Sequence, residues 1–527
     1  MIGDRLSQIF HAVFLALFAV VVLYILAGEQ EPFLLLALTA VSFAAVMGIY
    51  HILGTKNITD QRLNAATAVI LIAMAAVMAV TGWWLIPKLR TDLGMVYYSA
   101  MEIIEDGKVS DVFNEHNEIT TITNMTNNEY FVVYPNNLPI LFLLTCFYRI
   151  VCGLEISMDT DLGVYMAILL NLAVILGSVW LGSRVARRLL GNRAAFFFLV
   201  IACLFVPYYI NVSRFYTDTM TLPFPVLSIY LYLRLKESKS RTRSLLLAAG
   251  LGLCLAAGFL LKGSCLIVAV ALLIYGILEV MRRKVGIKRF ALLVLTALLC
   301  FGGSAGGWNW YVRHASWIDM SREEELTFPM AHWVMMSMSG TGGYNRTDFD
   351  YTYSYPTKEE KSQADWERAR EKIEGYGGLA GFLNFEFQKI AATWGDGKYT
   401  QQIHLTWNQK RTVIQDFTRT DGKYYGIFYN YTTVFVLTMY LFFLLSIGKG
   451  IRSKNSPRTL IHLCIFGALL FFAFWETKSR YLLNFTPVFF LCVLYGLEDS
   501  LPLQRGRHRM SGEHSDGKSP KLRSNKD

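Results

Sequence analysis

Long runs of apolar residues, interrupted by shorter polar segments, extend along most of the chain. Clear examples are FHAVFLALFAVVVLYILA, FLLLALTAVSFAAVMGIYHIL and GIFYNYTTVFVLTMYLFFLLSI. An α-helix needs about 20 apolar residues to cross the core of a bilayer, and these runs have that length. The pattern predicts an all-α polytopic membrane protein with about 12 or 13 transmembrane helices. Because a second run follows the first at once, the first reads as an uncleaved anchor rather than a secretory signal.

One apolar segment, LPILFLLTCFYRIV at 138–151, is shorter than the others. A full crossing by this segment would place the basic stretch 186–193 outside the membrane, which the positive-inside rule disfavours. We therefore expect 138–151 to be tilted, re-entrant or paired with an unusual loop.

The basic residues identify the cytoplasmic connections, because cytoplasmic loops of membrane proteins are enriched in Lys and Arg. They gather in four short segments between apolar runs: 183–193, 234–243, 281–289 and 449–458. The long connections 88–136 and 314–424 then lie outside a plasma membrane that the chain crosses many times. Since the net charge of +10 comes from these short clusters, the sequence predicts no nucleic-acid partner.

The same pattern divides the chain into five regions. Helical periodicity in the two long connections predicts juxtamembrane helices outside the membrane, among them an amphipathic helix at 88–107 and a charged helix in TKEEKSQADWERAREKIEGYGG, so that 314–424 is one long helical external loop. The regions are two extra N-terminal transmembrane helices (1–64), a membrane core (65–313) with the first external loop (88–136), an extracytoplasmic loop domain (314–424), C-terminal transmembrane helices (425–500) and a disordered basic cytoplasmic tail (501–527).

Composition agrees with a membrane protein. Hydrophobic residues make up 54% of the chain and charged residues only 17%, whereas soluble domains carry about a quarter charged residues. Most of the 8 cysteines lie in or beside apolar runs, and none forms a CxxC pair. The sequence therefore predicts neither a disulfide framework nor a cysteine metal site.

Asp92 lies directly before a helical segment in KLRTDLGMVYYSAMEIIEDG. A Thr-Asp pair in that position is typical of a helix N-cap. A carboxylate just outside a membrane could instead act as a general base that takes a proton from an acceptor hydroxyl. The two roles are compatible, because Thr91 could cap the helix while Asp92 points outward.

The segment NVSRFYTDTMTLPFPV places Arg214, Tyr216 and Asp218 at an external membrane boundary. Charges so close to two spans are costly unless they pair or face a polar cavity. Arg214 and Asp218 could form a surface ion pair, or they could form a wall of a site for an anionic ligand.

Two basic residues, Lys262 in GFLLKGSCLIVAV and Arg480 in FWETKSRYLLNFTP, also lie at predicted external boundaries. Lys262 could snorkel to the interface without any function. Outside the membrane, however, it departs from the charge bias of the loops, and a fixed ammonium there suits a lipid phosphate. Arg480 could grip a phosphate with two parallel hydrogen bonds.

The segment VVYPNNLP returns the chain to the membrane after the first external loop and contains Tyr134, Asn136 and Asn137. Hydroxyl and amide groups at this point could bind the hydroxyls of a sugar, or they could form a turn directed by the prolines.

The order of these motifs resembles that of the GT-C superfamily of integral-membrane glycosyltransferases, in the branch of protein O-mannosyltransferases and lipid A aminoarabinose transferases. An aspartate in the first external loop is followed by YP at re-entry, then by ARRLLGNRAA, SRFYTD, LLKG and ETKSRYLLNFTP. The resemblance covers roughly residues 65–310 and 425–497. The chain departs from it in three ways, since no acidic residue follows Asp92, two spans precede residue 65, and loop 314–424 is longer than in many relatives.

The resemblance implies a sugar donor carried on a polyprenyl phosphate and a transfer that inverts the anomeric centre. It also implies an acidic residue in the first loop that acts as catalytic base or positions the acceptor, and Asp92 matches that position. Asp218 and Lys262 match positions that border the donor phosphate, and Arg480 matches a late basic position. Whether a divalent metal takes part stays open.

The sequence thus predicts a glycosyltransferase that moves a hexose or pentose from a polyprenyl-phosphate donor to a cell-envelope glycopolymer or lipid, on the extracytoplasmic face. A protein acceptor, as in protein O-mannosyltransferases, is the alternative within this class. A transporter or flippase of lipid-linked sugars is the alternative of another class, although neither the internal repeats nor the mid-span charges of transporters are evident. Asp92 is the predicted base, and the predicted donor-phosphate or substrate-binding residues are Lys262, Arg480, Asp218, Arg214, Tyr216, Tyr134 and Asn136.

Overall fold

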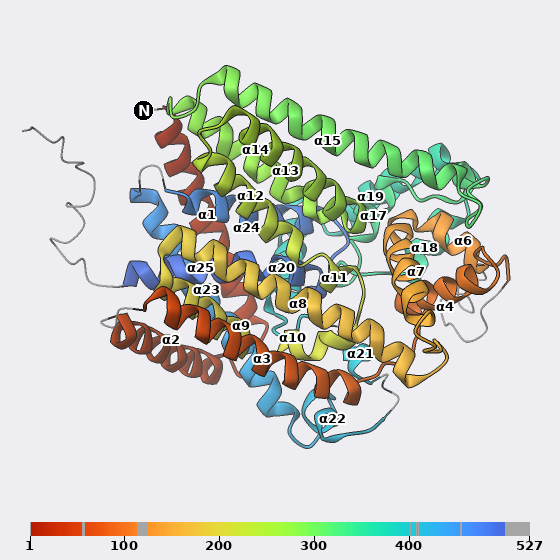
Figure 1. Cartoon of the computed structure of the whole chain (residues 1–527), viewed down its shortest axis with the longest axis horizontal. Helices are drawn as coiled ribbons and strands as arrows, with labels where there is room; N and C mark the ends of the chain where they lie inside the picture. Colours follow the sequence, from red (N-terminus) through yellow and green to blue (C-terminus); the bar gives the residue numbers. More distant parts are fainter. Residues whose placement is uncertain are drawn as a thin grey trace, which may run out of the picture.

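The computed structural model describes residues 2–54, 58–112, 125–400, 402–406, 408, 410–453 and 456–500, so the predicted tail at 501–527 lies outside the described residues. Within these ranges the chain is helical and contains no strand. The longer helices lie side by side in one bundle (Figure 1). They are α1 (Ile2–Ala27), α2 (Pro32–Gly54), α3 (Asp60–Trp84), α8 (Asp161–Leu190), α9 (Asn192–Leu204), α12 (Pro223–Glu237), α13 (Arg241–Leu261), α14 (Leu266–Met281), α15 (Ile287–His314), α23 (Tyr425–Arg452), α24 (Arg458–Phe474) and α25 (Thr486–Ser500).

The prediction of an all-α polytopic membrane protein is confirmed. In the described part of the chain, 10 helices are long and apolar enough to cross a membrane, or 11 if one bent pair is counted as a span. The predicted 12 or 13 is higher because apolar runs in a sequence include shorter helices, such as α24 with its 17 residues.

The short segment 138–151 belongs to a longer helical unit than the sequence suggests. A 3₁₀ turn, η1 (Pro135–Asn137), leads directly into α7 (Leu138–Cys152), and together they give an 18-residue candidate span. The sharp bend lies elsewhere, at 53° between α9 and the short helices α10 (Pro207–Ile210) and η2 (Asn211–Ser213). Pro207 has no amide hydrogen with which to continue α9, which explains the break.

Helix α1 packs one face against α23, α20 and α14. A buried hydrogen-bond chain anchors it. His11 Nδ1 donates to the carbonyl of Ser7 (2.6 Å), which leaves His11 Nε2 to accept from His462 Nδ1 (3.0 Å), and His462 Nε2 in turn accepts from the hydroxyl of Ser446 (2.9 Å). Every ring nitrogen is satisfied in neutral imidazoles, as a low-dielectric interior requires. Gly450 permits the close approach, because a Cβ there would lie 2.2 Å from the His11 ring.

The connections predicted to lie outside form short helices, of which α4, α6, α17, α18 and α19 gather at one end of the bundle, on the right in Figure 1, opposite the end where the N-terminus lies. Helix α19 starts at the N-cap Thr357, whose hydroxyl accepts from the amide of Glu360 (3.2 Å), and it ends before Gly377 and Gly378, which have positive φ. The helices are α4 (Thr91–Glu105), α6 (Asn127–Val133), α16 (Glu323–Leu326), α17 (Met330–Met336), α18 (Arg346–Tyr353), α19 (Lys358–Gly375), α20 (Leu379–Gly395), α21 (Gln402–Thr406) and α22 (Val413–Thr418).

The external loop 314–424 is fastened to the membrane helices by polar contacts. The fully buried ammonium of Lys389 in α20 pairs with Glu386 (2.8 Å) and donates to the carbonyls of Ser337 and Ala473. The amide of Thr477 donates to the carbonyl of Gly342 (2.7 Å). These contacts hold the loop over the segment that precedes α25, where Arg480 lies.

Candidate active site

Four charged side chains from distant parts of the sequence form one continuous chain of ion pairs. Arg480 Nη1 lies 3.1 Å from Oδ2 of Asp218, and Arg480 Nη2 lies 3.8 Å from Oδ2 of Asp92. Lys262 Nζ donates to Oδ1 of Asp218. The side chains of Arg480, Asp218 and Lys262 are 9%, 10% and 13% exposed, whereas that of Asp92 is 33% exposed. Asp92 is therefore the member of the chain that a solvent-borne group can reach most easily.

Asp92 lies in the first turn of α4, but it does not cap that helix. The N-cap residue is Arg90, and no side chain provides a capping hydrogen bond there. Thr91 has a φ of +57°, a left-handed conformation that is rare for a β-branched residue. Such strained backbone persists only where the surrounding structure holds it, and it is common at functional sites. The carboxylate of Asp92 is thus free of the helix end and is directed toward Tyr130 and Arg480.

A hydrogen-bonded network from the first external loop orients Asp92. The hydroxyl of Tyr130 donates to Oδ1 of Asp92 (2.8 Å) and accepts from Asn137 Nδ2 (2.7 Å). Asn137 Oδ1 in turn accepts from the hydroxyl of Tyr216 (2.5 Å). All three network residues are buried. Because each polar group has a partner, the network fixes the rotamer of Asp92 before any ligand arrives.

Three breaks in the helices place the other charged groups. Asp218 lies in the single-turn helix α11 (Thr217–Met220), Lys262 follows α13 in an extended conformation (φ −159°, ψ 113°), and Arg480 lies in the 3₁₀ segment η4 (Ser479–Phe485). Irregular backbone of this kind at a membrane boundary is tolerated where it lines a polar site within the protein. Each break directs a charged side chain inward between the helices.

The charges at the site stabilise one another. Burial would raise the pKa of the Asp218 carboxyl, but Lys262 and Arg480 together lower it below its usual value. Burial lowers the pKa of the Lys262 ammonium, and Asp218 offsets part of that effect. One N–H donor of the Arg480 guanidinium is unsatisfied, because its buried Nε has no hydrogen-bond partner among the described residues. A buried donor without an acceptor costs free energy, and an anionic ligand would relieve that cost.

The other predicted site residues lie around the chain of ion pairs, and they differ in how many contacts they make with it. Tyr134 packs against Tyr130 (ring centroids 5.1 Å apart) and Trp333 (6.0 Å), and burial raises the pKa of its phenol. Asn136 is exposed and donates only to Asn137 (3.3 Å), so Asn137 rather than Asn136 belongs to the buried network.

Arg214 is close to the charged chain without joining it. Its side chain forms no ion pair with Asp218 among the described residues, because Asp218 is engaged by Lys262 and Arg480 instead. Burial and the neighbouring Arg480 lower the pKa of the Arg214 guanidinium to about 9. The arrangement is thus a cationic wall beside Asp218 and not the simple surface pair that the sequence also allowed.

Several further side chains complete the site. Glu476 accepts from the hydroxyl of Tyr481 (3.1 Å) and lies 3.6 Å from Lys478 Nζ, which lies 5.9 Å from the ring centroid of Tyr344 in the external loop. Glu476, Lys478 and Tyr481 lie within four residues of Arg480 in the sequence, and this proximity is the feature by which the sequence indicates them as members of the same site. No such signal marked Tyr130 or Tyr344, since a tyrosine in a helix or a glycine-rich loop is usually a packing residue.

The charged groups at this site are two cations, Arg480 and Lys262, paired with the carboxylates of Asp92 and Asp218. Among the residues that the structure describes, no group of three or more His, Cys, Asp or Glu side chains is placed to hold a metal ion. The guanidinium of Arg480 lies between Asp92 and Asp218 and pairs with both carboxylates.

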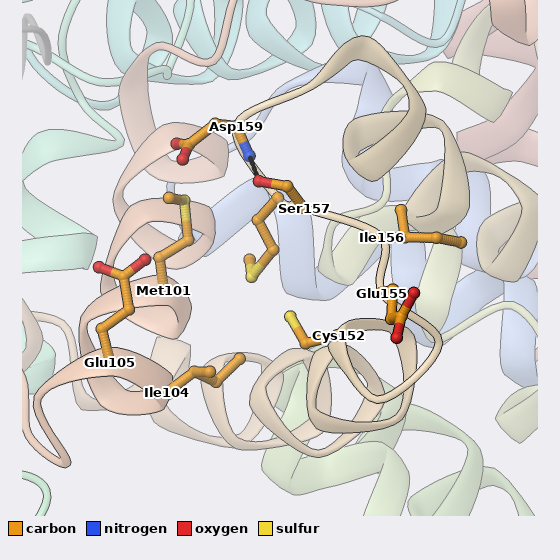
Figure 2. Close-up of a pocket in the computed structure, with 9 residues that line it drawn as sticks. Met101, Ile104, Glu105, Cys152, Glu155, Ile156, Ser157 and Asp159 are labelled. Atoms are coloured by element: carbon orange, nitrogen blue, oxygen red, sulfur yellow. Dashed lines mark hydrogen bonds between the residues drawn. The ribbon is translucent and has the colours of Figure 1, made fainter.

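A separate pocket of about 260 Å³ opens at the other end of α4, between α4 and the end of α7 (Figure 2). Glu105, Cys152 and Asp159 are among its lining residues, and none of the predicted site residues lines it. Because Glu105 and Asp92 lie at opposite ends of one helix, the pocket is roughly 20 Å from the charged chain.

Comparison with known proteins gives a family for this chain. No curated protein sequence matches the chain. A similar solved structure is that of ArnT from Cupriavidus metallidurans bound to undecaprenyl phosphate, with 14% sequence identity, a TM-score of 0.31, and coverage of 80% of this chain and 77% of that chain. The model of one protein family, described as "Conserved hypothetical integral membrane protein", matches residues 2–501. The chain, whose helices cross a membrane many times, therefore belongs to this family of conserved hypothetical integral membrane proteins.

Proposed function

We propose that this protein is a membrane glycosyltransferase that moves a sugar from a polyprenyl-phosphate donor to an acceptor on the extracytoplasmic side, with inversion at the anomeric carbon. One observation carries the proposal: the buried guanidinium of Arg480 lies between two carboxylates, of which Asp218 is also held by Lys262 and Asp92 is open to solvent. The arrangement combines a place for an anionic leaving group with a carboxylate that can accept a proton.

The basic residues provide the place for the donor phosphate. Arg480 has an Nε–H that is free to donate to a phosphate oxygen. Two further cations lie nearby: Lys262, whose Nζ is 4.6 Å from the ring centroid of Tyr481, and Lys478, which lies beside Glu476. When the bond between the anomeric carbon and the phosphate oxygen breaks, the polyprenyl phosphate gains negative charge. Cations fixed in a partly dehydrated site stabilise that developing charge without the cost of reorganising water.

Asp92 serves as the general base. The acceptor hydroxyl attacks the anomeric carbon from the face opposite to the phosphate, and Oδ2 of Asp92 takes its proton as the new glycosidic bond forms. The hydrogen bond from Tyr130 to Oδ1 holds the carboxylate in the required rotamer. A carboxylate that is already oriented loses little entropy in the reaction.

Asp218 acts as a positioning residue. It accepts from Lys262 and pairs with Arg480, so it holds both cations in one geometry. It also offsets the mutual repulsion of the two cations before the donor binds.

The extracytoplasmic location rests on the charge distribution. The site lies at the end of the bundle that carries the helices of loop 314–424, while the basic connections 183–193, 234–243 and 281–289 join the helices at the other end. Since cytoplasmic loops carry the Lys and Arg excess, the site faces outward. A polyprenyl-phosphate sugar presents its activated sugar there without a nucleotide, and envelope glycans, lipids and secreted proteins are the acceptors within reach.

The proposal is tested with purified protein in proteoliposomes that contain a panel of polyprenyl-phosphate hexoses and pentoses. A fluorescent or radiolabelled acceptor fraction of the cell envelope is added outside, with unfolded secreted protein as a second acceptor. The expected result is that the labelled acceptor gains the sugar covalently, with release of free polyprenyl phosphate. Movement of the intact lipid-linked sugar between leaflets without any transfer would contradict the proposal and indicate a flippase.

A further inference from the structure

A second cavity lies between helices α8, α12, α14 and α24, near the end of the bundle opposite to α4 and α17 (Figure 1). Its volume is about 140 Å³. Two cations, Arg188 and Lys236, and two tyrosines, Tyr232 and Tyr275, line it together with aliphatic side chains such as Leu233 and Ile461. None of the residues of the proposed active site lines this cavity, so it is a distinct place on the molecule.

The two cations are fixed in place by carboxylates that do not line the cavity. Arg188, in the last turn of α8, pairs with Glu237, since its Nη1 donates to both carboxylate oxygens (2.8 and 2.7 Å). Lys236, in the last turn of α12, pairs with the buried Glu279 (2.6 Å). The Arg188 and Lys236 side chains remain 28% and 38% exposed. They are therefore pre-oriented but still accessible to a ligand.

One of the two tyrosines in the cavity wall, Tyr275, has a hydroxyl without a hydrogen-bond partner among the described residues. Tyr275 is 1% exposed. Lys236 Nζ lies 5.6 Å from the centroid of the same ring. A buried hydroxyl without a partner costs free energy. An oxygen-rich ligand beside Lys236 would give the hydroxyl of Tyr275 an acceptor and would add a second anionic partner to the Lys236 ammonium.

The apolar part of the cavity wall indicates that the anionic group belongs to a molecule with an apolar portion. Ile229, Leu233 and Leu460 line it alongside the cations, which an inorganic anion would not require. The cations end helices that continue into the basic connections 183–193 and 234–243, so the cavity lies at the depth of the cytoplasmic headgroups. Basic pockets between transmembrane helices on that side suit anionic lipid headgroups.

We propose that this cavity binds the phosphate of an anionic glycerophospholipid from the cytoplasmic leaflet. Arg188 and Lys236 contact the phosphate, Tyr275 donates to one of its oxygens, and the upper part of an acyl chain follows the aliphatic wall. The site does not depend on the glycosyltransferase proposal, since it uses different residues at the opposite end of the bundle.

The test uses the full chain, delipidated in a mild detergent and examined by native mass spectrometry after addition of dioleoyl phosphatidylglycerol. We expect one tightly retained lipid on the wild type and roughly tenfold weaker retention by Arg188→Gln and by Lys236→Gln, the loss typical of one charge-assisted contact. Tyr275→Phe weakens retention by about threefold and leaves the fold unchanged, because it removes only the hydroxyl. Arg188→Lys restores part of the loss.

Arg184→Gln is the matched control, because Arg184 lies one turn earlier on α8, 5.4 Å from the ring centroid of Trp180, and does not line the cavity. Retention by this variant stays at the wild-type level. Equal loss in Arg184→Gln would show that only the general charge of this end attracts lipid, and the proposal would fail. Equally tight retention of dioleoyl phosphatidylcholine would also overturn it, as would binding of inorganic phosphate at the same affinity as the lipid.

Discussion

The hydroxyl of Tyr130 donates a 2.8 Å hydrogen bond to Oδ1 of Asp92, and Tyr130 itself is fully buried. The two residues come from different helices of the first external loop, α4 and α6. This contact joins the carboxylate to a network that continues through Asn137 to Tyr216, next to the cationic part of the site. The orientation of Asp92 is therefore set by the fold of the loop and not by the helix on which it lies.

Tyr130→Phe removes this hydrogen bond while it keeps the buried ring. We expect kcat for sugar transfer to fall by about 10- to 100-fold, because a less well oriented base is a poorer one. The donor KM should change little, since Tyr130 does not contact the cations. Steady-state kinetics measure both quantities. Tyr98→Phe, which changes a half-buried tyrosine of α4, is the control and should retain wild-type activity; a similar loss in both variants would remove the special role of Tyr130.

Arg480→Lys tests whether the guanidinium is needed or only its charge. Lysine has no planar fork with which to contact Asp92 and Asp218 together and offer a third donor to phosphate. We expect kcat/KM for the donor to fall by roughly 10²- to 10³-fold, the usual cost of one lost transition-state donor. Arg419→Lys, which alters an exposed pair with Asp421, is the control. Wild-type kinetics in Arg480→Lys would contradict the role assigned to Arg480.

The buried carboxyl of Asp365 in α19 should make the stability of the external loop depend on pH. Burial raises the pKa of its carboxyl from 3.8 to about 6, while Thr352 donates to one oxygen (2.6 Å) and the other oxygen has no partner among the described residues. Because the folded state holds this proton more tightly than the unfolded chain, the contribution of Asp365 to stability falls as pH rises from about 4 to 6. Asp365→Asn should therefore raise the melting temperature at pH 8 and leave it nearly unchanged at pH 4, as measured by tryptophan fluorescence. A lower melting temperature at pH 8 would contradict this account.

Because His11 and His462 are hydrogen-bonded, we expect their substitutions to have non-additive effects on the free energy of unfolding. His11→Leu leaves the Nδ1–H of His462 without an acceptor inside the bundle, which costs about 1–3 kcal/mol. Adding His462→Leu replaces both polar groups and should recover part of that loss. Thermal unfolding in detergent measures the four proteins of the cycle. Strictly additive losses would show that the two imidazoles do not stabilise each other.

The membrane class and the four charged residues could be predicted because both follow from strong local signals. Apolar runs of bilayer length identify spans, and a charged residue between two spans is costly enough to stand out. Asp218, Lys262 and Arg480 stand out on that ground, whereas Asp92 stands out as a carboxylate directly before a helical segment of the first external loop. Their catalytic roles remain predictions, but the structure does bring them into one chain of ion pairs.

The details of the site could not be predicted because they depend on backbone geometry. Asn136 and Asn137 are chemically equivalent in the sequence, and only the 3₁₀ turn η1 turns Asn137 inward. Tyr344 reaches the site from the external loop because Gly342 packs against Thr477, a contact that no local pattern encodes. The packing of α1 likewise depends on His11, which bonds to a residue 451 positions away in the sequence.

The most direct test of the central claim compares Asp92→Asn with wild type in the transfer assay and in donor binding. The control is Asp106→Asn, an exposed carboxylate at the other end of α4. We expect Asp92→Asn to lose at least about 10²-fold in kcat, since it removes the general base, while the affinity for the polyprenyl-phosphate sugar stays within about threefold and Asp106→Asn is unaffected. Undiminished transfer by Asp92→Asn would contradict the account and remove Asp92 from the mechanism.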